Sequence, residues 1–153
     1  MIASTMTLVM ALTAGASDAG FDAAFERLKS LVGTWQIVGE SGGEVTYFLT
    51  GGDAAVVERF DRMSSVYHMD GSDLRVTHYC GAKNQPRMKA ASYDSEKGLL
   101  RFDFVDVTNL SAPDAYYTRE IQFRFLDADN VEVRFSGLEK GEEKPATVRL
   151  RRK

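Results

Sequence analysis

Residues 65–80 read SVYHM-DGSD-LRVTHYC, and this stretch decides the fold. Apolar and polar side chains alternate on both sides of Asp70-Gly71, a dipeptide typical of a short hairpin turn. In the second half, Leu74, Val76 and His78 share one face of an extended chain, and the residues between them share the other. The stretch therefore predicts two antiparallel strands with one buried face.

Strands of this kind recur along the chain, separated by short turns rich in glycine, aspartate and asparagine. The predicted strands are residues 35–38, 45–49, 55–60, 65–69, 74–80, 87–93, 99–105, 116–126, 131–138 and 146–152. Consecutive hairpins need no long crossover, and closure of the sheet removes its exposed edges. We therefore predict an all-β fold, an antiparallel up-and-down β-barrel of about ten strands, with a two-sheet sandwich as the alternative. A barrel of this size should leave an internal cavity.

One amphipathic helix is predicted before the strands. Its apolar positions have helical spacing and form one stripe: Phe21, Phe25, Leu28, Leu31 and Val32. We expect the helix to end at Gly33, where the hydrophobic period changes from 3.6 to 2. The helix would then lie across one end of the barrel as a cap, within a single domain spanning residues 21–153.

Composition excludes several classes of protein. The chain has 153 residues, of which 44% are hydrophobic and 27% charged, as in one ordinary globular domain. A formal net charge of -3 argues against a nucleic-acid partner, which needs a basic face. One cysteine excludes an internal disulfide, and with only two histidines it leaves little for a zinc site. We expect no metal and no cofactor, and a monomer or weak dimer.

The first residues resemble a secretory signal. Residues 5–16 are apolar, uncharged and too short to span a bilayer, and they end in the small-x-small pattern Ala14-Gly15-Ala16. We predict that residues 1–16 are a signal peptide and that the protein is exported to the periplasm or secreted, although Met1–Ser4 contains no basic residue. If the segment is instead an N-terminal arm, the protein is cytoplasmic. No transmembrane segment is expected.

The order of these elements resembles a known superfamily. A helix followed by Gly-x-Trp at residues 33–35, an up-and-down run of strands and a basic last strand resemble the lipocalin and fatty-acid-binding (calycin) β-barrels. Residues 78–80 with 84–88 are similar to a signature of small exported bacterial lipocalin-like proteins of unassigned function. The resemblance implies that the tryptophan is structural and that Arg149 or Arg151 is its cation–π partner.

Polar side chains gather where strand 74–80 meets the next strand. His78 and Cys80 share the apolar face, and Asn84, Gln85 and Arg87 follow at the same rim. Small-molecule sites combine apolar walls with a few convergent polar groups. The predicted ligand-binding residues are Tyr47, Tyr67, His78, Cys80, Asn84, Gln85, Arg87, Met88, Phe102 and Phe104. The alternation along residues 87–92 leaves open whether Arg87 faces the cavity.

Three functions fit this pattern. The first is the binding of a small hydrophobic or amphipathic molecule in the cavity, with no catalytic residue. The second is an isomerase, cyclase or hydrolase in which His78 is the general acid or base. The third is a structural envelope protein with a filled barrel, in which His78 is a core imidazole. His78 as an axial haem ligand is a further alternative, although no Cys-x-x-Cys-His is present. Residues 106–115 form either a lid or an ordinary loop.

Overall fold

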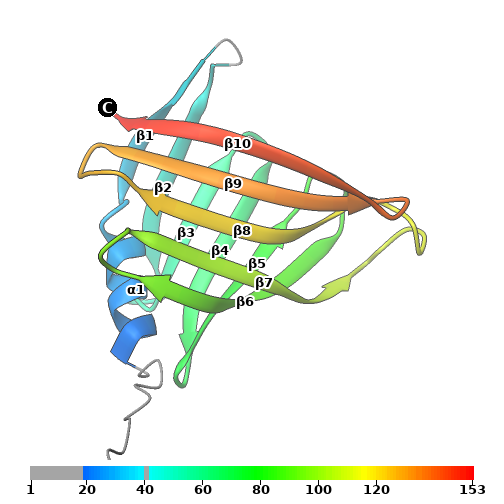
Figure 1. The fold of residues 1–153 in the computed structure, drawn as a ribbon, viewed down its shortest axis with the longest axis horizontal. Helices are drawn as coiled ribbons and strands as arrows, with labels where there is room; N and C mark the ends of the chain where they lie inside the picture. Colours follow the sequence, from blue (N-terminus) through cyan, green and yellow to red (C-terminus); the bar gives the residue numbers. More distant parts are fainter. Residues whose placement is uncertain (1–18, 40–41) are drawn as a thin grey trace, which may run out of the picture.

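The strands form one closed sheet. In a computed structural model, which describes residues 19–39 and 42–153, ten antiparallel strands follow one another around a barrel, and the first pairs with the last (Figure 1). The predicted up-and-down barrel is confirmed. The predicted signal peptide at residues 1–16 lies outside the described residues.

Each predicted strand has a counterpart with similar bounds. The strands are β1 Gly33–Val38, β2 Glu44–Thr50, β3 Ala55–Phe60, β4 Met63–Asp70, β5 Asp73–Tyr79, β6 Gln85–Asp94, β7 Leu99–Thr108, β8 Tyr117–Phe125, β9 Asn130–Glu139 and β10 Glu142–Arg152. The connector expected at residues 106–115 is shorter than predicted, because β7 continues to Thr108. The last residues of β7 pair with the start of β6, where Thr108 lies opposite Gln85.

The helix α1 spans Ala19–Lys29 and closes one end of the barrel, beside the ends of β4, β5 and β6 (Figure 1). Ala24, Phe25 and Leu28 are buried against the barrel. The helix ends before Gly33, where its end was predicted. The prediction that Val32 belongs to the apolar stripe was wrong, because Val32 is 42% exposed. After Lys29 the chain turns through shorter-range hydrogen bonds, which rotates Val32 away from the core. Among the described residues, no helix is long and apolar enough to cross a bilayer.

Trp35 joins the turn after the helix to the first and last strands. The side chain is fully buried, and its Nε1–H donates to the Leu31 carbonyl oxygen at 2.6 Å. The guanidinium of Arg152 lies over the indole, 4.3 Å from the ring centroid. The prediction that Arg149 or Arg151 is the cation–π partner of Trp35 was therefore wrong. Trp35 lies directly opposite Arg152 in the sheet, and directly opposite residues share a face. Arg149 and Arg151 are an odd number of residues away from Arg152, so their side chains point to the other face.

Aromatic side chains fill the half of the barrel nearer the helix. Tyr67, Phe102 and Phe123 are all fully buried, and the Tyr67 ring lies 5.7 Å from each of the two phenylalanine rings. Their tilted and edge-on arrangements are typical of well-packed aromatic groups. This end of the barrel is therefore solid, and any internal space must lie toward the opposite end.

Candidate functional site

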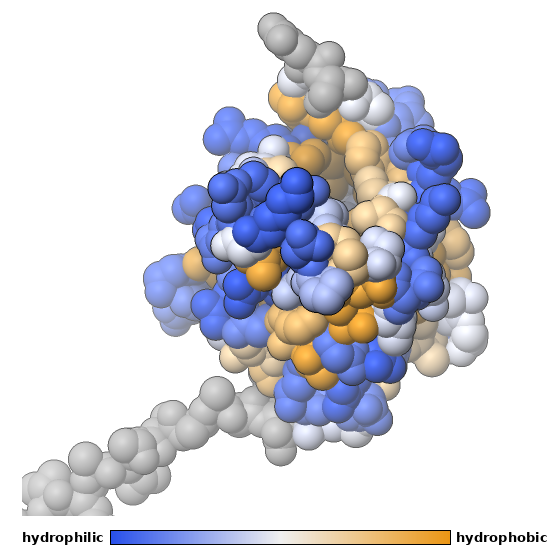
Figure 2. Space-filling model, turned by 90° about the vertical axis from the view of Figure 1, so that its right-hand side faces the viewer, coloured by the Kyte–Doolittle hydropathy of each residue, from blue (hydrophilic) through white to orange (hydrophobic). Residues whose placement is uncertain are grey.

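A cavity of about 260 Å³ lies in the half of the barrel away from α1. Its wall is mostly apolar and comes from β1–β5 and β8–β10. The lining residues are Ile37, Val45, Tyr47, Glu58, Phe60, Met63, His78, Cys80, Tyr116, Thr118, Val133, Phe135, Ala146, Val148 and Leu150. Figure 2 looks onto this end of the barrel, where apolar surface is visible between hydrophilic groups. The arrangement is that of a ligand pocket with a few polar groups in an apolar wall.

Three polar residues of the wall form one row with Ser65 across four neighbouring strands. In the register of the sheet, Tyr47 of β2 lies opposite Glu58 of β3, Glu58 opposite Ser65 of β4, and Ser65 opposite His78 of β5. Side chains of directly opposite residues share a face and have Cβ atoms about 5 Å apart. The backbone register alone therefore brings these four side chains together inside the barrel.

Glu58 is the centre of the row. Its side chain is 6% exposed, and its Oε2 accepts hydrogen bonds from the hydroxyls of Tyr47 and Tyr67, both at 3.0 Å. Oε1 accepts only a long one, 3.4 Å, from Ser65. Burial raises the pKa of Glu58, although the three hydroxyl groups oppose this by stabilising the carboxylate. Burial, with the neighbouring Glu58, raises the pKa values of both tyrosines well above the usual range, so the tyrosines are donors at neutral pH.

His78 ends the row at the cavity. The imidazole is 7% exposed, and its Nδ1 lies 3.0 Å from the Ser65 hydroxyl oxygen. Burial lowers the pKa of His78 to about 4, so the ring is neutral at pH 7. Within the described part of the chain, Nε2 makes no hydrogen bond, which leaves this nitrogen available to a bound molecule.

The ionisation of Glu58 favours one tautomer of His78, because Ser65 connects the two side chains. Ser65 has one hydroxyl proton and lies within reach of both side chains. When Glu58 is ionised, Ser65 donates to it and accepts from the Nδ1–H of His78, so Nε2 is an acceptor. When Glu58 is protonated, the chain of donors reverses and Nε2 becomes a donor. Through Ser65, the charge of Glu58 thus favours one hydrogen-bonding role for Nε2 at the edge of the cavity.

The structure brings three of the predicted site residues to the cavity: Tyr47, His78 and Cys80. The strand β5 alternates as the sequence predicted, with His78 on the buried face and Tyr79 exposed. Tyr67 reaches Glu58 through its hydroxyl group but does not line the cavity. Met88 and Phe102 are buried in the packed half of the barrel.

The other predicted residues lie away from the cavity. Asn84 is buried, and its amide nitrogen donates to the Tyr116 carbonyl oxygen at 2.7 Å, which ties the β5–β6 turn to the start of β8. Gln85 bonds to the Thr108 hydroxyl, and Phe104 packs against Tyr117. Arg87 is exposed and paired with Asp106 on the outer face. Arg87 therefore does not line the cavity.

Two residues of the row, Glu58 and Ser65, were absent from the predicted site. Glu58 stands between Val56 and Phe60, which share its face, so a carboxylate on an apolar face was the signal available. Val57 on the opposite face is also apolar, and the alternation of β3 therefore did not fix which face is buried. Only the pairing with β2 and β4 resolves this.

The position of one cavity-lining ring depends on a glycine. A Cβ atom at Gly137 would overlap the ring of Tyr116, which lines the cavity. We expect Gly137→Ala to lower the free energy of unfolding by about 1–3 kcal/mol, because the ring must move away. When Tyr116 is already replaced by alanine, Gly137→Ala should cost little further stability, since the obstructing ring is gone. Urea unfolding of the four proteins in the cycle measures the coupling.

Gly20→Ala is the matched control for this prediction. Gly20 lies in α1, and nothing occupies the space its Cβ would fill. The alanine should be neutral or slightly stabilising, since alanine is the better helix former. Additive losses for Gly137→Ala and Tyr116→Ala would contradict the contact.

The closed ten-strand barrel with one helix is consistent with the lipocalin-like architecture. Neither the protein-family models nor the curated protein sequences include a match to the chain. Membership of the lipocalin superfamily therefore stays a prediction.

Proposed function

We propose that the protein binds one small, largely apolar molecule in the open half of the barrel, with its polar end at the Tyr47–Glu58–Ser65–His78 row. The cavity carries this proposal, because apolar walls and one polar row are what such a ligand requires. A cavity of about 150 Å³ holds benzene, so about 260 Å³ takes roughly ten non-hydrogen atoms.

The properties of His78 favour binding over catalysis. A general base works best when its pKa is near the working pH. Burial lowers the pKa of His78 to about 4, so at neutral pH the ring is a weak base and a good hydrogen-bonding group. The presence of an open cavity, in turn, favours binding over the filled structural barrel.

Titration with octan-1-ol tests the proposal, because its nine non-hydrogen atoms match the cavity. Amide NMR spectra of the full chain should show saturable 1:1 binding, with the largest changes at residues around the cavity. Val148→Phe should weaken this binding at least tenfold, because Val148 lines the cavity and the added ring would fill it.

Val105→Phe is the control for the same substitution. Val105 is 49% exposed on β7 and does not line the cavity, so its affinity for octan-1-ol should match that of the unmodified protein. The proposal fails if octan-1-ol does not saturate, if the shifts lie outside the cavity, or if both variants bind equally well.

A further inference from the structure

The cavity contains a buried carboxylate without a cationic partner. Glu58 lines the cavity, and its described hydrogen-bond partners are the uncharged hydroxyls of Tyr47, Tyr67 and Ser65. Among the residues that the structure describes, the lining includes no lysine or arginine. A buried charge is costly unless it is paired, so a positively charged group beside this carboxylate would stabilise its ionised form.

The carboxylate is also incompletely bonded. Oε2 accepts two hydrogen bonds at 3.0 Å, whereas Oε1 accepts a single one at 3.4 Å from Ser65. A carboxylate oxygen has room for two donors. Oε1 therefore has an unfilled acceptor position.

Nε2 of His78, which also belongs to the cavity wall, is likewise a free acceptor. With Glu58 ionised, Ser65 donates to Glu58 and His78 donates to Ser65, so the free Nε2 of His78 is an acceptor. Glu58 Oε1 and His78 Nε2 thus both require a donor from the ligand. A ligand carboxylate offers none, and it would bring a second negative charge beside the first.

We propose that the ligand is an amphiphilic amine, with its ammonium group at Glu58 and His78 and its apolar part along Val133, Val148 and Leu150. This rests on the proposed binding function and names the class of ligand. An ammonium group has three donors and a positive charge, so it fills the free acceptors and neutralises the carboxylate. The apolar wall takes the remaining surface of the molecule.

A matched series of ligands tests the proposal on the unmodified protein. n-Octylamine, octan-1-ol and octanoate have nearly the same apolar part and differ in the polar end. At pH 7.5 the amine carries a positive charge and octanoate a negative one. We expect octylamine to bind about tenfold or more tightly than octan-1-ol, and octanoate at least about a hundredfold more weakly than octylamine.

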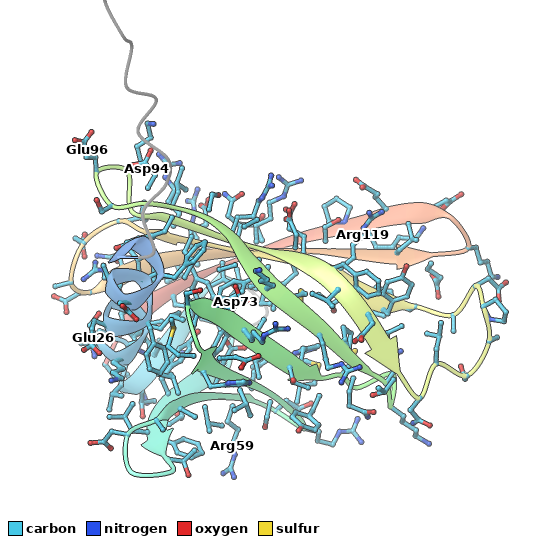
Figure 3. The ribbon with its side chains drawn as sticks, turned by 90° about the horizontal axis from the view of Figure 1, so that it is seen from below. Glu26, Arg59, Asp73, Asp94, Glu96 and Arg119 are labelled. Carbon is cyan, nitrogen blue, oxygen red and sulfur yellow. The ribbon has the colours of Figure 1, made fainter. Side chains whose placement is uncertain are left out.

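Glu58→Gln should remove the preference. The amide keeps the shape of the side chain and an acceptor for the tyrosine hydroxyls, but not the charge. Octylamine and octan-1-ol should then bind with affinities within about threefold of each other. Glu96→Gln is the control, with the same chemistry and change of charge. Glu96 is exposed on the β6–β7 turn at the α1 end of the barrel, as Figure 3 shows, and this variant should keep the preference.

The orientation of octylamine gives a measurement that needs no variant. Intermolecular NOEs should connect the methylene next to nitrogen with the ring protons of Tyr47 or His78, and the terminal methyl with the apolar wall. The reverse orientation overturns the proposal.

The outcomes separate the two proposals. If none of the three ligands binds, the binding function itself fails. If octan-1-ol binds at least as tightly as octylamine, or if octanoate binds best, the assignment of an amine fails while the binding function stands. If Glu58→Gln keeps the amine preference, the placement of the ammonium group at Glu58 fails. The expected order, lost in Glu58→Gln and kept in Glu96→Gln, supports both.

Discussion

Replacing Trp35 by alanine should lower the free energy of unfolding by about 3–5 kcal/mol, the largest loss we expect from a single substitution in this chain. The indole is fully buried, so its removal leaves a large hole in the core. It also removes the hydrogen bond to the Leu31 carbonyl oxygen and the stacking partner of Arg152. A domain of this kind has a total stability of about 5–15 kcal/mol, so the loss is a large part of it.

Trp35→Phe separates the packing from the polar contacts. Phenylalanine keeps a ring in the core but cannot donate to Leu31, and we expect a loss of about 1–2 kcal/mol. This variant also keeps the test informative if Trp35→Ala does not fold. Trp35 is the only tryptophan, so unfolding in urea should be followed by circular dichroism and not by fluorescence.

Arg152→Lys tests the other side of the same contact. The guanidinium lies over the indole and donates to the carbonyl oxygens of Ser30 and Val32, which follow the helix. Lysine keeps the charge but not the flat, forked group. A loss under about 1 kcal/mol for Trp35→Ala would contradict the view that this cluster holds the segment after the helix to the barrel.

The barrel was predictable because the signals for its strands and turns lie in short, continuous segments of sequence. Period-2 alternation and short turns mark each strand, and consecutive hairpins leave few topologies to choose from. β3, for example, has the predicted bounds, residues 55–60. The wrong prediction for Val32 has a cause that the spacing of apolar residues does not show. Val32 has the right spacing for the apolar stripe, but the hydrogen bonding changes after Lys29 and turns Val32 outward.

The partner of Trp35 required the register of strands far apart in sequence. Three arginines occur in the last strand, and the sequence does not say which one lies opposite residue 35. Closure of the barrel pairs Trp35 with Arg152 and places Arg149 opposite Val38. A shift of one residue exchanges the two faces of a strand, so a small uncertainty in register changes the partner completely.

The candidate site was predictable only in part, for the same reason. The alternation of β5 placed His78 on the buried face, and the structure has it there. The row that includes Glu58 and Ser65 depends on three pairings between strands, which no single segment encodes. Nor does the sequence say which half of the barrel is filled, because the positions of Tyr67 and Phe102 along the barrel depend on those pairings too.

Lowering the pH from 7 to 4 should cost the unmodified protein about 3 kcal/mol of stability through His78 alone. Burial lowers the pKa of His78 from 6.5 to about 4, so the unfolded chain takes up a proton more readily than the folded one. Stability from this group is therefore complete above pH 6.5 and is lost as the pH falls toward 4. The difference in stability between the unmodified protein and His78→Gln, measured in urea at several pH values, isolates this contribution.

Glu58 acts in the opposite direction and provides the comparison. Its pKa is raised by burial, so its folded carboxyl group takes up a proton more readily than the unfolded one, and this stability is lost as the pH rises. His78→Gln, which retains Glu58, should be less sensitive to acid than the unmodified protein, and Glu58→Gln, which retains His78, should be more sensitive. Equal acid sensitivity in the two variants would mean that neither side chain is buried in the row as described, and the polar end of the cavity would then be open to water.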